Sequence, residues 1–66
     1  MQLTVNGETR AFEAVPHVAA LVEHLGLDRR KVAVERNLEI VARSAYEATA
    51  LAEGDRIEIV HFIGGG

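Results

Sequence analysis

The stretch Met1-Gln2-Leu3-Thr4-Val5-Asn6-Gly7 decides the fold, because it joins a strand pattern directly to a hairpin turn. Its apolar residues at 1, 3 and 5 alternate with polar ones, as in a strand with one buried face. Asn6-Gly7 suits a type I′ turn, since both central residues of that turn need a positive φ. The sequence therefore predicts a β-hairpin whose second strand covers about residues 9 to 14, with Phe12 as its main apolar side chain.

One helix is predicted after this hairpin. Pro16 ends the strand and suits the first turn of a helix, because its ring fixes φ near the helical value. A single apolar face follows at helical spacing, made by Val18, Leu21, Val22 and Leu25. Gly26 and Leu27 suit a left-handed cap that ends the helix.

The rest of the chain is mainly strand. A third strand is predicted at Val32-Ala33-Val34 and a short fourth at Leu38-Glu39-Ile40-Val41. A turn at Glu53-Gly54-Asp55 leads into the last strand, and the alanine-rich segment 42–51 fits one helical turn. These elements predict an α+β domain over residues 1–63, with a sheet of four to five strands and one main helix on one face, followed by a flexible glycine tail at 64–66.

Length and charge argue against several classes of function. A chain of 66 residues buries only about 60% of its unfolded surface, so a core and a catalytic cleft compete for the same residues. A net charge of −3 argues against binding to nucleic acid or to a membrane surface, and Arg29-Arg30-Lys31 is only a short basic corner. No stretch is apolar and long enough to span a bilayer, and no leader peptide is recognised, so we expect a cytoplasmic protein.

The last strand, which begins at Arg56, carries apolar side chains on both faces. With a period of two, Ile57 and Ile59 point to the helix, and the opposite, helix-free face receives Arg56, Glu58, Val60 and Phe62. Two interpretations are open for Val60 and Phe62. Either a loop hides them at the end of the sheet, or they form a docking patch for a partner protein.

Three glycines, Gly64-Gly65-Gly66, follow that strand. Without Cβ atoms they can thread a partner channel too narrow for any side chain, which makes the carboxylate of Gly66 a candidate reactive group. The other interpretation is an ordinary frayed end or a remnant of cloning. A docking patch at Val60 and Phe62 favours the first interpretation, because it would hold the domain while Gly64 and Gly65 enter the partner.

Several short motifs, taken in order, resemble the ThiS family of sulfur carriers in thiamine biosynthesis. They are Val5-Asn6-Gly7-Glu8, Val32-Ala33-Val34-Glu35-Arg36-Asn37, Ile40-Val41, Arg43-Ser44, Glu53-Gly54-Asp55-Arg56-Ile57-Glu58-Ile59-Val60 and Gly65-Gly66. The resemblance implies a ubiquitin-like β-grasp fold with a mixed sheet. It also implies that a ThiF-like enzyme adenylates the Gly66 carboxylate with ATP, that Gly66 becomes a thiocarboxylate, and that the thiazole synthase ThiG takes the sulfur.

This resemblance makes the chain a protein co-substrate rather than an enzyme. It binds no cofactor, because the activating enzyme uses the ATP. An unperturbed terminal carboxyl titrates at about 3.3 to 3.7, so Gly66 is ionised at neutral pH. The absence of cysteine suits a carrier, since a stray thiol would capture the activated acyl group. The chain departs from the family pattern at Ala42, Tyr46 and Val15-Pro16-His17, all of them outside the glycine end.

Two alternatives stay open. The same glycine chemistry serves other clients in a molybdopterin-synthase small subunit, a tRNA-thiolation carrier or a protein-conjugating modifier. The alternative from another class is a β-grasp interaction module that is never activated.

Other candidate sites are weaker. His17, His24 and His61 lack metal-ligand spacing and are expected to be partly solvated structural residues. Ser44 lacks a nucleophile elbow and a nearby histidine. Glu35, Arg36 and Arg43 are expected to form a solvated charged face, with rim contacts to a partner at most.

Overall fold

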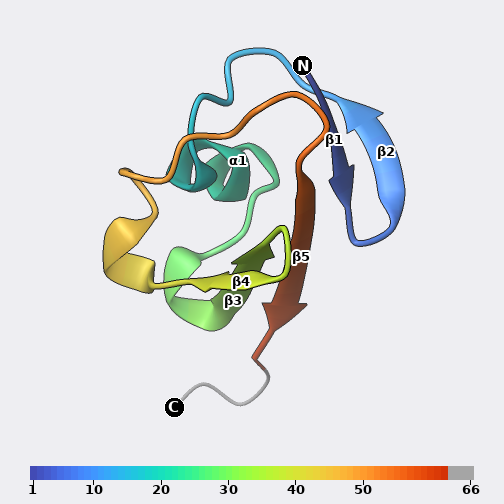
Figure 1. Ribbon diagram of the computed structural model, residues 1–66. Helices are drawn as coiled ribbons and strands as arrows, with labels where there is room; N and C mark the ends of the chain where they lie inside the picture. Colours follow the sequence, from blue (N-terminus) through green and yellow to red (C-terminus); the bar gives the residue numbers. More distant parts are fainter. Residues whose placement is uncertain (63–66) are drawn as a thin grey trace.

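In the computed structural model, which describes residues 1–62, one mixed sheet is covered on one face by a single α-helix (Figure 1). The strands lie in the order β2-β1-β5-β3-β4. The described elements are β1 (Gln2–Val5), β2 (Glu8–Ala11), α1 (Val18–His24), β3 (Val32–Arg36), β4 (Glu39–Val41) and β5 (Arg56–His61), with short 3-10 helices η1 (Arg29–Lys31) and η2 (Arg43–Ala45). The predicted α+β class, with five strands and one main helix, is confirmed.

Strand β5 lies in the middle of the sheet and joins two hairpins (Figure 1). It pairs in parallel with β1 and antiparallel with β3, while β1–β2 and β3–β4 are antiparallel hairpins. Both hairpins turn through two residues of positive φ: Asn6 and Gly7 in the first, Asn37 and Leu38 in the second. The predicted turn at Asn6-Gly7 is confirmed, but the fourth strand is one residue shorter than predicted because Leu38 belongs to the turn.

Strand β2 ends at Ala11, before the predicted limit near residue 14. Ala14 has a φ of 56°, a conformation outside the β region, so the strand could not have continued to residue 14. Phe12 still contributes to the core as predicted, since it is buried and its N–H donates to the Met1 carbonyl at 2.8 Å.

Helix α1 is capped at both ends. Pro16 lies just before the helix, and His17 rather than proline begins it: the ring Nδ1 of His17 accepts from the N–H of Ala20 at 3.1 Å. The imidazole therefore accepts the capping hydrogen bond that a serine or threonine hydroxyl more often accepts. At the other end Gly26 has a φ of 73°, and the N–H of Leu27 donates to the carbonyl of Val22 at 3.1 Å, which confirms the predicted left-handed cap.

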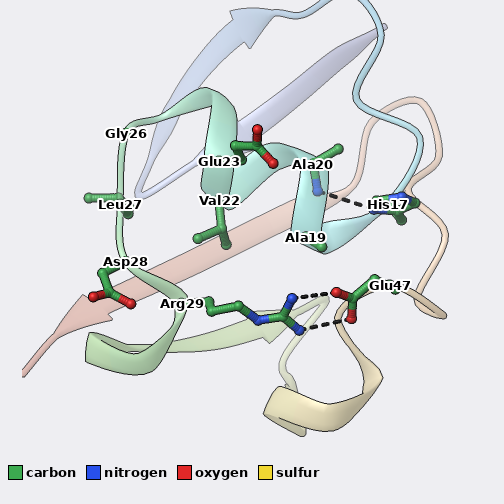
Figure 2. A pocket seen from close by; sticks show the side chains of 10 residues that line it. All are labelled: His17, Ala19, Ala20, Val22, Glu23, Gly26, Leu27, Asp28, Arg29 and Glu47. Carbon is green, nitrogen blue, oxygen red and sulfur yellow. Dashed lines mark hydrogen bonds and ion pairs between the residues drawn. The ribbon is translucent and has the colours of Figure 1, made fainter.

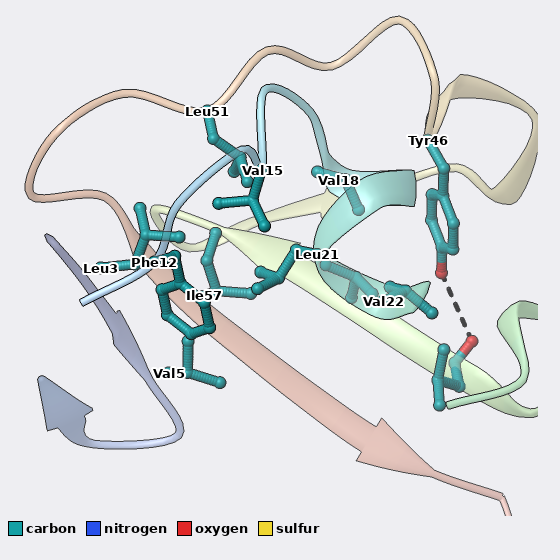
Figure 3. Close-up of a cluster of buried hydrophobic side chains, with 12 residues drawn as sticks. Leu3, Val5, Phe12, Val15, Val18, Leu21, Val22, Tyr46, Leu51 and Ile57 are labelled. Carbon is teal, nitrogen blue, oxygen red and sulfur yellow. Dashed lines mark hydrogen bonds between the residues drawn. The ribbon is translucent and has the colours of Figure 1, made fainter. Parts of the chain in front are cut away.

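The core lies between α1 and the covered face of the sheet (Figure 3). Its buried side chains come from α1, from strands β1, β3 and β5 and from the loops. They are Leu3, Val5, Phe12, Val15, Val18, Leu21, Val22, Val32, Val34, Tyr46, Leu51 and Ile57. Tyr46 is fully buried and its hydroxyl donates to the Val32 carbonyl at 3.4 Å. Burial raises the pKa of this phenol, so it stays neutral and keeps its donor. Within residues 1–62 no helix is long and apolar enough to cross a bilayer.

Candidate docking face and the approach to the glycine end

The two faces of β5 differ as predicted. Ile57 is fully buried and Ile59 packs against the core, whereas Val60 is 60% exposed and Phe62 is 50% exposed. The interpretation in which a loop hides Val60 and Phe62 is wrong for the described part of the chain. Both side chains are free to meet a partner, and their role in docking stays a prediction.

The end of β5 is held on both sides. On one side the N–H of Phe62 donates to the Lys31 carbonyl at 2.8 Å. On the other side, β1 pairs with β5 only at Thr4 and Val5 before the chain turns. There the side-chain amide of Asn6 replaces a peptide group: its Oδ1 accepts from the N–H of Ile59 at 2.7 Å and its Nδ2 donates to the Ile59 carbonyl at 3.2 Å. The end of β5 is therefore held by hydrogen bonds on both sides, as far as Phe62.

Gly64, Gly65 and Gly66 lie outside the described residues, together with Ile63. The predicted roles of Gly66 as the modified residue, and of Gly64 and Gly65 in a partner channel, stay predictions. The described structure bears on these predictions only through β5, which precedes the glycines in the chain.

A buried carboxylate joins the β3–β4 hairpin to the start of β5. Asp55 is 7% exposed and accepts from Nε of Arg36 at 2.8 Å, from Nδ2 of Asn37 at 3.0 Å and from the N–H of Ala52 at 2.8 Å. Asn37 Oδ1 also accepts from the N–H of Arg56 at 2.9 Å. The expectation that Arg36 belongs to a solvated face is wrong, because Arg36 is half-buried in this ion pair.

Two opposing effects set the pKa of Asp55. Burial disfavours the charged form and acts to raise the pKa. The hydrogen bonds from Asn37, Ala52 and Arg36 favour the carboxylate, and together they hold the pKa below its ordinary value. Sequence reasoning missed this network, because Asp55 looked like a turn residue and its partners lie 18 and 19 positions earlier in the chain.

A hollow beside α1 has no link to the predicted site (Figure 2). Arg29 and Glu47 both line the hollow, and Nη2 of Arg29 donates to Oε1 of Glu47 at 2.8 Å. The hydrogen bonds from Arg29 lower the pKa of Glu47 to about 2. His17 is engaged as the helix cap and Asp28 is paired with Arg30, so four of the five polar side chains around the hollow already serve the fold.

The weaker candidates have structural surroundings. His24 contacts Phe12 edge to face with ring centroids 5.5 Å apart, and His61 is exposed on β5. Ser44 is exposed in η2. Among residues 1–62, no cluster of His, Cys, Asp and Glu has the geometry to hold a metal ion.

One family model and several known proteins are similar to this chain. A model of the ThiS family matches residues 3–66. A thiazole synthase of Paramagnetospirillum magneticum is 59% identical over all 66 residues, and the chain spans 20% of that relative's length. The sulfur carrier protein ThiS of Bacillus subtilis is 50% identical over 40 residues, which are 61% of each chain.

A solved structure agrees with the fold. The crystal structure of the thiamine biosynthesis protein ThiS from Geobacter metallireducens has a TM-score of 0.84 and 36% identity, and the match covers 100% of both chains. The predicted ubiquitin-like β-grasp fold is confirmed by this likeness, together with the mixed sheet and single helix of this chain.

Proposed function

Because this chain belongs to the ThiS family, we propose that it is a sulfur carrier of thiamine biosynthesis whose reactive group is the carboxylate of Gly66. The observation that carries the proposal is the position of Val60 and Phe62. These exposed apolar side chains lie at the end of β5, where the N–H of Phe62 still donates to the Lys31 carbonyl, and only Ile63 separates Phe62 from the glycines. A partner that grips this face has the glycine end within reach.

The proposed chemistry has two steps. The ionised Gly66 carboxylate attacks the α-phosphorus of ATP in a ThiF-like enzyme, which forms an acyl adenylate and releases pyrophosphate. Hydrosulfide then attacks the acyl carbon and displaces AMP, which leaves a thiocarboxylate and releases a proton. A persulfide donor would instead give an acyl disulfide, from which a thiol reductant must release the thiocarboxylate. A carboxylate is a poor acyl donor and the mixed anhydride is a good one, so ATP supplies the driving force and the partner enzyme supplies the catalysis.

We propose a thiazole synthase of the ThiG type as the client. Two relatives that match all 66 residues, at 59% and 48% identity, are thiazole synthases about five times as long as this chain. A carrier region and a thiazole-forming region on one polypeptide point to thiazole formation in preference to molybdopterin synthesis, tRNA thiolation or protein conjugation. The carrier itself acts as a co-substrate in this scheme.

Intact-protein mass spectrometry tests the proposal. The protein ending at Gly66 is incubated with ATP, a ThiF-like enzyme and sulfide as the sulfur source. We expect a product in which one oxygen of the C-terminal carboxylate is replaced by sulfur, with an AMP adduct when sulfide is left out. A protein whose mass stays unchanged under conditions that modify the Bacillus subtilis ThiS protein would contradict the proposal.

A further inference from the structure

The face of the sheet away from α1 is built from β4, β3 and β5. Ile40 is the register partner of Glu35, and Glu35 is the register partner of Glu58. Register partners project to the same side of a sheet. The neighbouring residues Val34 and Ile59 pack toward the core, so Ile40, Glu35 and Glu58 form one row on the open side.

Apolar side chains flank this row. Val60 and Phe62 continue β5 on the same side, and Ile40 is 72% exposed. Leu38, at the tip of the β3–β4 hairpin, is 74% exposed. Of the large apolar side chains that are exposed among residues 1–62, only Met1 lies outside this group.

Leu38 is an unfavourable choice for the fold alone. It has a φ of 71°, a conformation in which asparagine or glycine is favoured and a bulky side chain is strained. Its side chain gains no burial in exchange. The described fold therefore gives no reason for a leucine at this position.

Two carboxylates face each other at the centre of this surface. Glu35 and Glu58 are directly opposed across β3 and β5, and like charges in that position destabilise a sheet. Arg56 offers weak relief, since its Nε lies 3.9 Å from Oε1 of Glu58. Among the described residues Glu35 forms no ion pair.

We propose that the thiazole synthase docks on this face with an apolar surface and places a basic side chain, best an arginine, between Glu35 and Glu58. The inference rests on the proposed function and adds the recognition chemistry. A guanidinium presents several donors in one plane and can bridge two carboxylates. Leu38, Ile40, Val60 and Phe62 surround that centre and exclude water from it.

Charge complementarity also argues against other occupants. A second copy of this chain, docked by the same face about a twofold axis, would bring Glu35 and Glu58 against the same pair of carboxylates. Nucleic acid would meet those carboxylates with phosphates. A basic, apolar protein surface is the occupant that relieves the repulsion.

The test separates recognition from stability. Glu35→Gln removes one of the two opposed charges, so the free domain should melt at a higher temperature than wild type. The same variant should bind its cognate thiazole synthase at least about tenfold more weakly, with a shallower dependence of the dissociation constant on salt. Glu13→Gln is the matched control, because Glu13 is exposed in the loop after β2 and changes the net charge equally. It should bind within about twofold of wild type.

Each outcome decides a different point. A Glu35→Gln protein that melts higher and binds like the control overturns the inference while the proposed function stands. Concentration-dependent dimerisation of wild type through this face, seen by sedimentation and strengthened by Glu35→Gln, overturns it in favour of a second copy. A wild-type protein that neither binds the synthase nor acquires sulfur overturns the proposed function together with the inference.

Discussion

Nε of Arg36 donates to Oδ2 of Asp55 at 2.8 Å, and this ion pair ties the end of β3 to the turn before β5. Asp55 also receives the side chain of Asn37 and the N–H of Ala52. Two of the sequence motifs that resemble the ThiS family, Val-Glu-Arg-Asn and Glu-Gly-Asp-Arg, therefore meet in space. The network fixes the hairpin that carries Leu38 and Ile40 relative to the strand that carries Val60.

Asp55→Ala should destabilise the domain by about 2 kcal/mol, because it leaves the Arg36 guanidinium and the Asn37 amide without their shared partner. Arg36 is still 32% exposed, so solvent screens part of the loss. Urea unfolding followed by circular dichroism measures the change. Glu13→Gln, which removes an exposed carboxylate, should unfold at the wild-type urea concentration, and an equal midpoint for Asp55→Ala would show that the network contributes nothing.

The same carboxylate makes stability depend on pH. The folded-state pKa of Asp55 is lower than the unfolded value near 3.8, so the unfolded chain binds more protons as pH falls. The stabilisation is thus complete above about pH 5 and is lost as pH falls through the folded-state pKa, below 3.8. The difference in unfolding free energy between wild type and Asp55→Ala should therefore shrink as the pH falls from 5 to 3. A difference that stays constant over that range would contradict the assigned direction of the pKa shift.

Changes at the glycine end should abolish modification without changing stability. Removing Gly66 moves the carboxylate back by about 3.5 Å, and adding an alanine after Gly66 converts that carboxylate to an amide. Gly65→Val adds a branched Cβ that a channel shaped for glycine cannot accept. All three proteins should melt like wild type, since the core consists of residues 3–57. The measurement is the yield of thiocarboxylate, determined by intact-protein mass spectrometry. If the truncated or extended protein gave the wild-type yield, Gly66 would not be the residue that is modified.

Phe62→Asp should weaken binding to the ThiF-like enzyme or the thiazole synthase by about 2 kcal/mol, roughly thirtyfold, because it places a charge where an apolar contact forms. The isolated domain should stay folded, since Phe62 is 50% exposed. Ala48→Asp, at an exposed position after η2, adds the same charge away from the open face and serves as the control. Isothermal titration gives both affinities. Equal affinities for the two variants would remove Phe62 from the interface.

Local sequence rules predicted the features that depend on neighbouring residues. Asn6-Gly7 indicated the first hairpin and Gly26-Leu27 the helix cap, because each sets a backbone conformation within a few residues. The alternation along β5 also separated Ile57 from Val60 correctly. Rules of this kind need no knowledge of the tertiary fold.

The features that were missed depend on residues far apart in the sequence. Asn6 was identified as a turn residue, and its amide contact with Ile59, 53 positions away, was not foreseen. Asp55 gave no sign of burial, and a histidine in the cap position gave no sign that its Nδ1 would accept the Ala20 N–H. Leu38 in a left-handed conformation contradicts local preference outright, so only the closed hairpin reveals it.

The position of β5 in the sheet also determines when the sheet can form during synthesis of the chain. It is the last described strand in the chain and the middle strand of the sheet, between β1 and β3. A nascent chain synthesised only to Asp55 holds two hairpins with no common edge, since β1 and β3 meet only through β5. The sheet therefore closes only after β5 has emerged from the ribosome, and a chain that stops before β5 lacks Ile57 of the core and the exposed Val60 and Phe62.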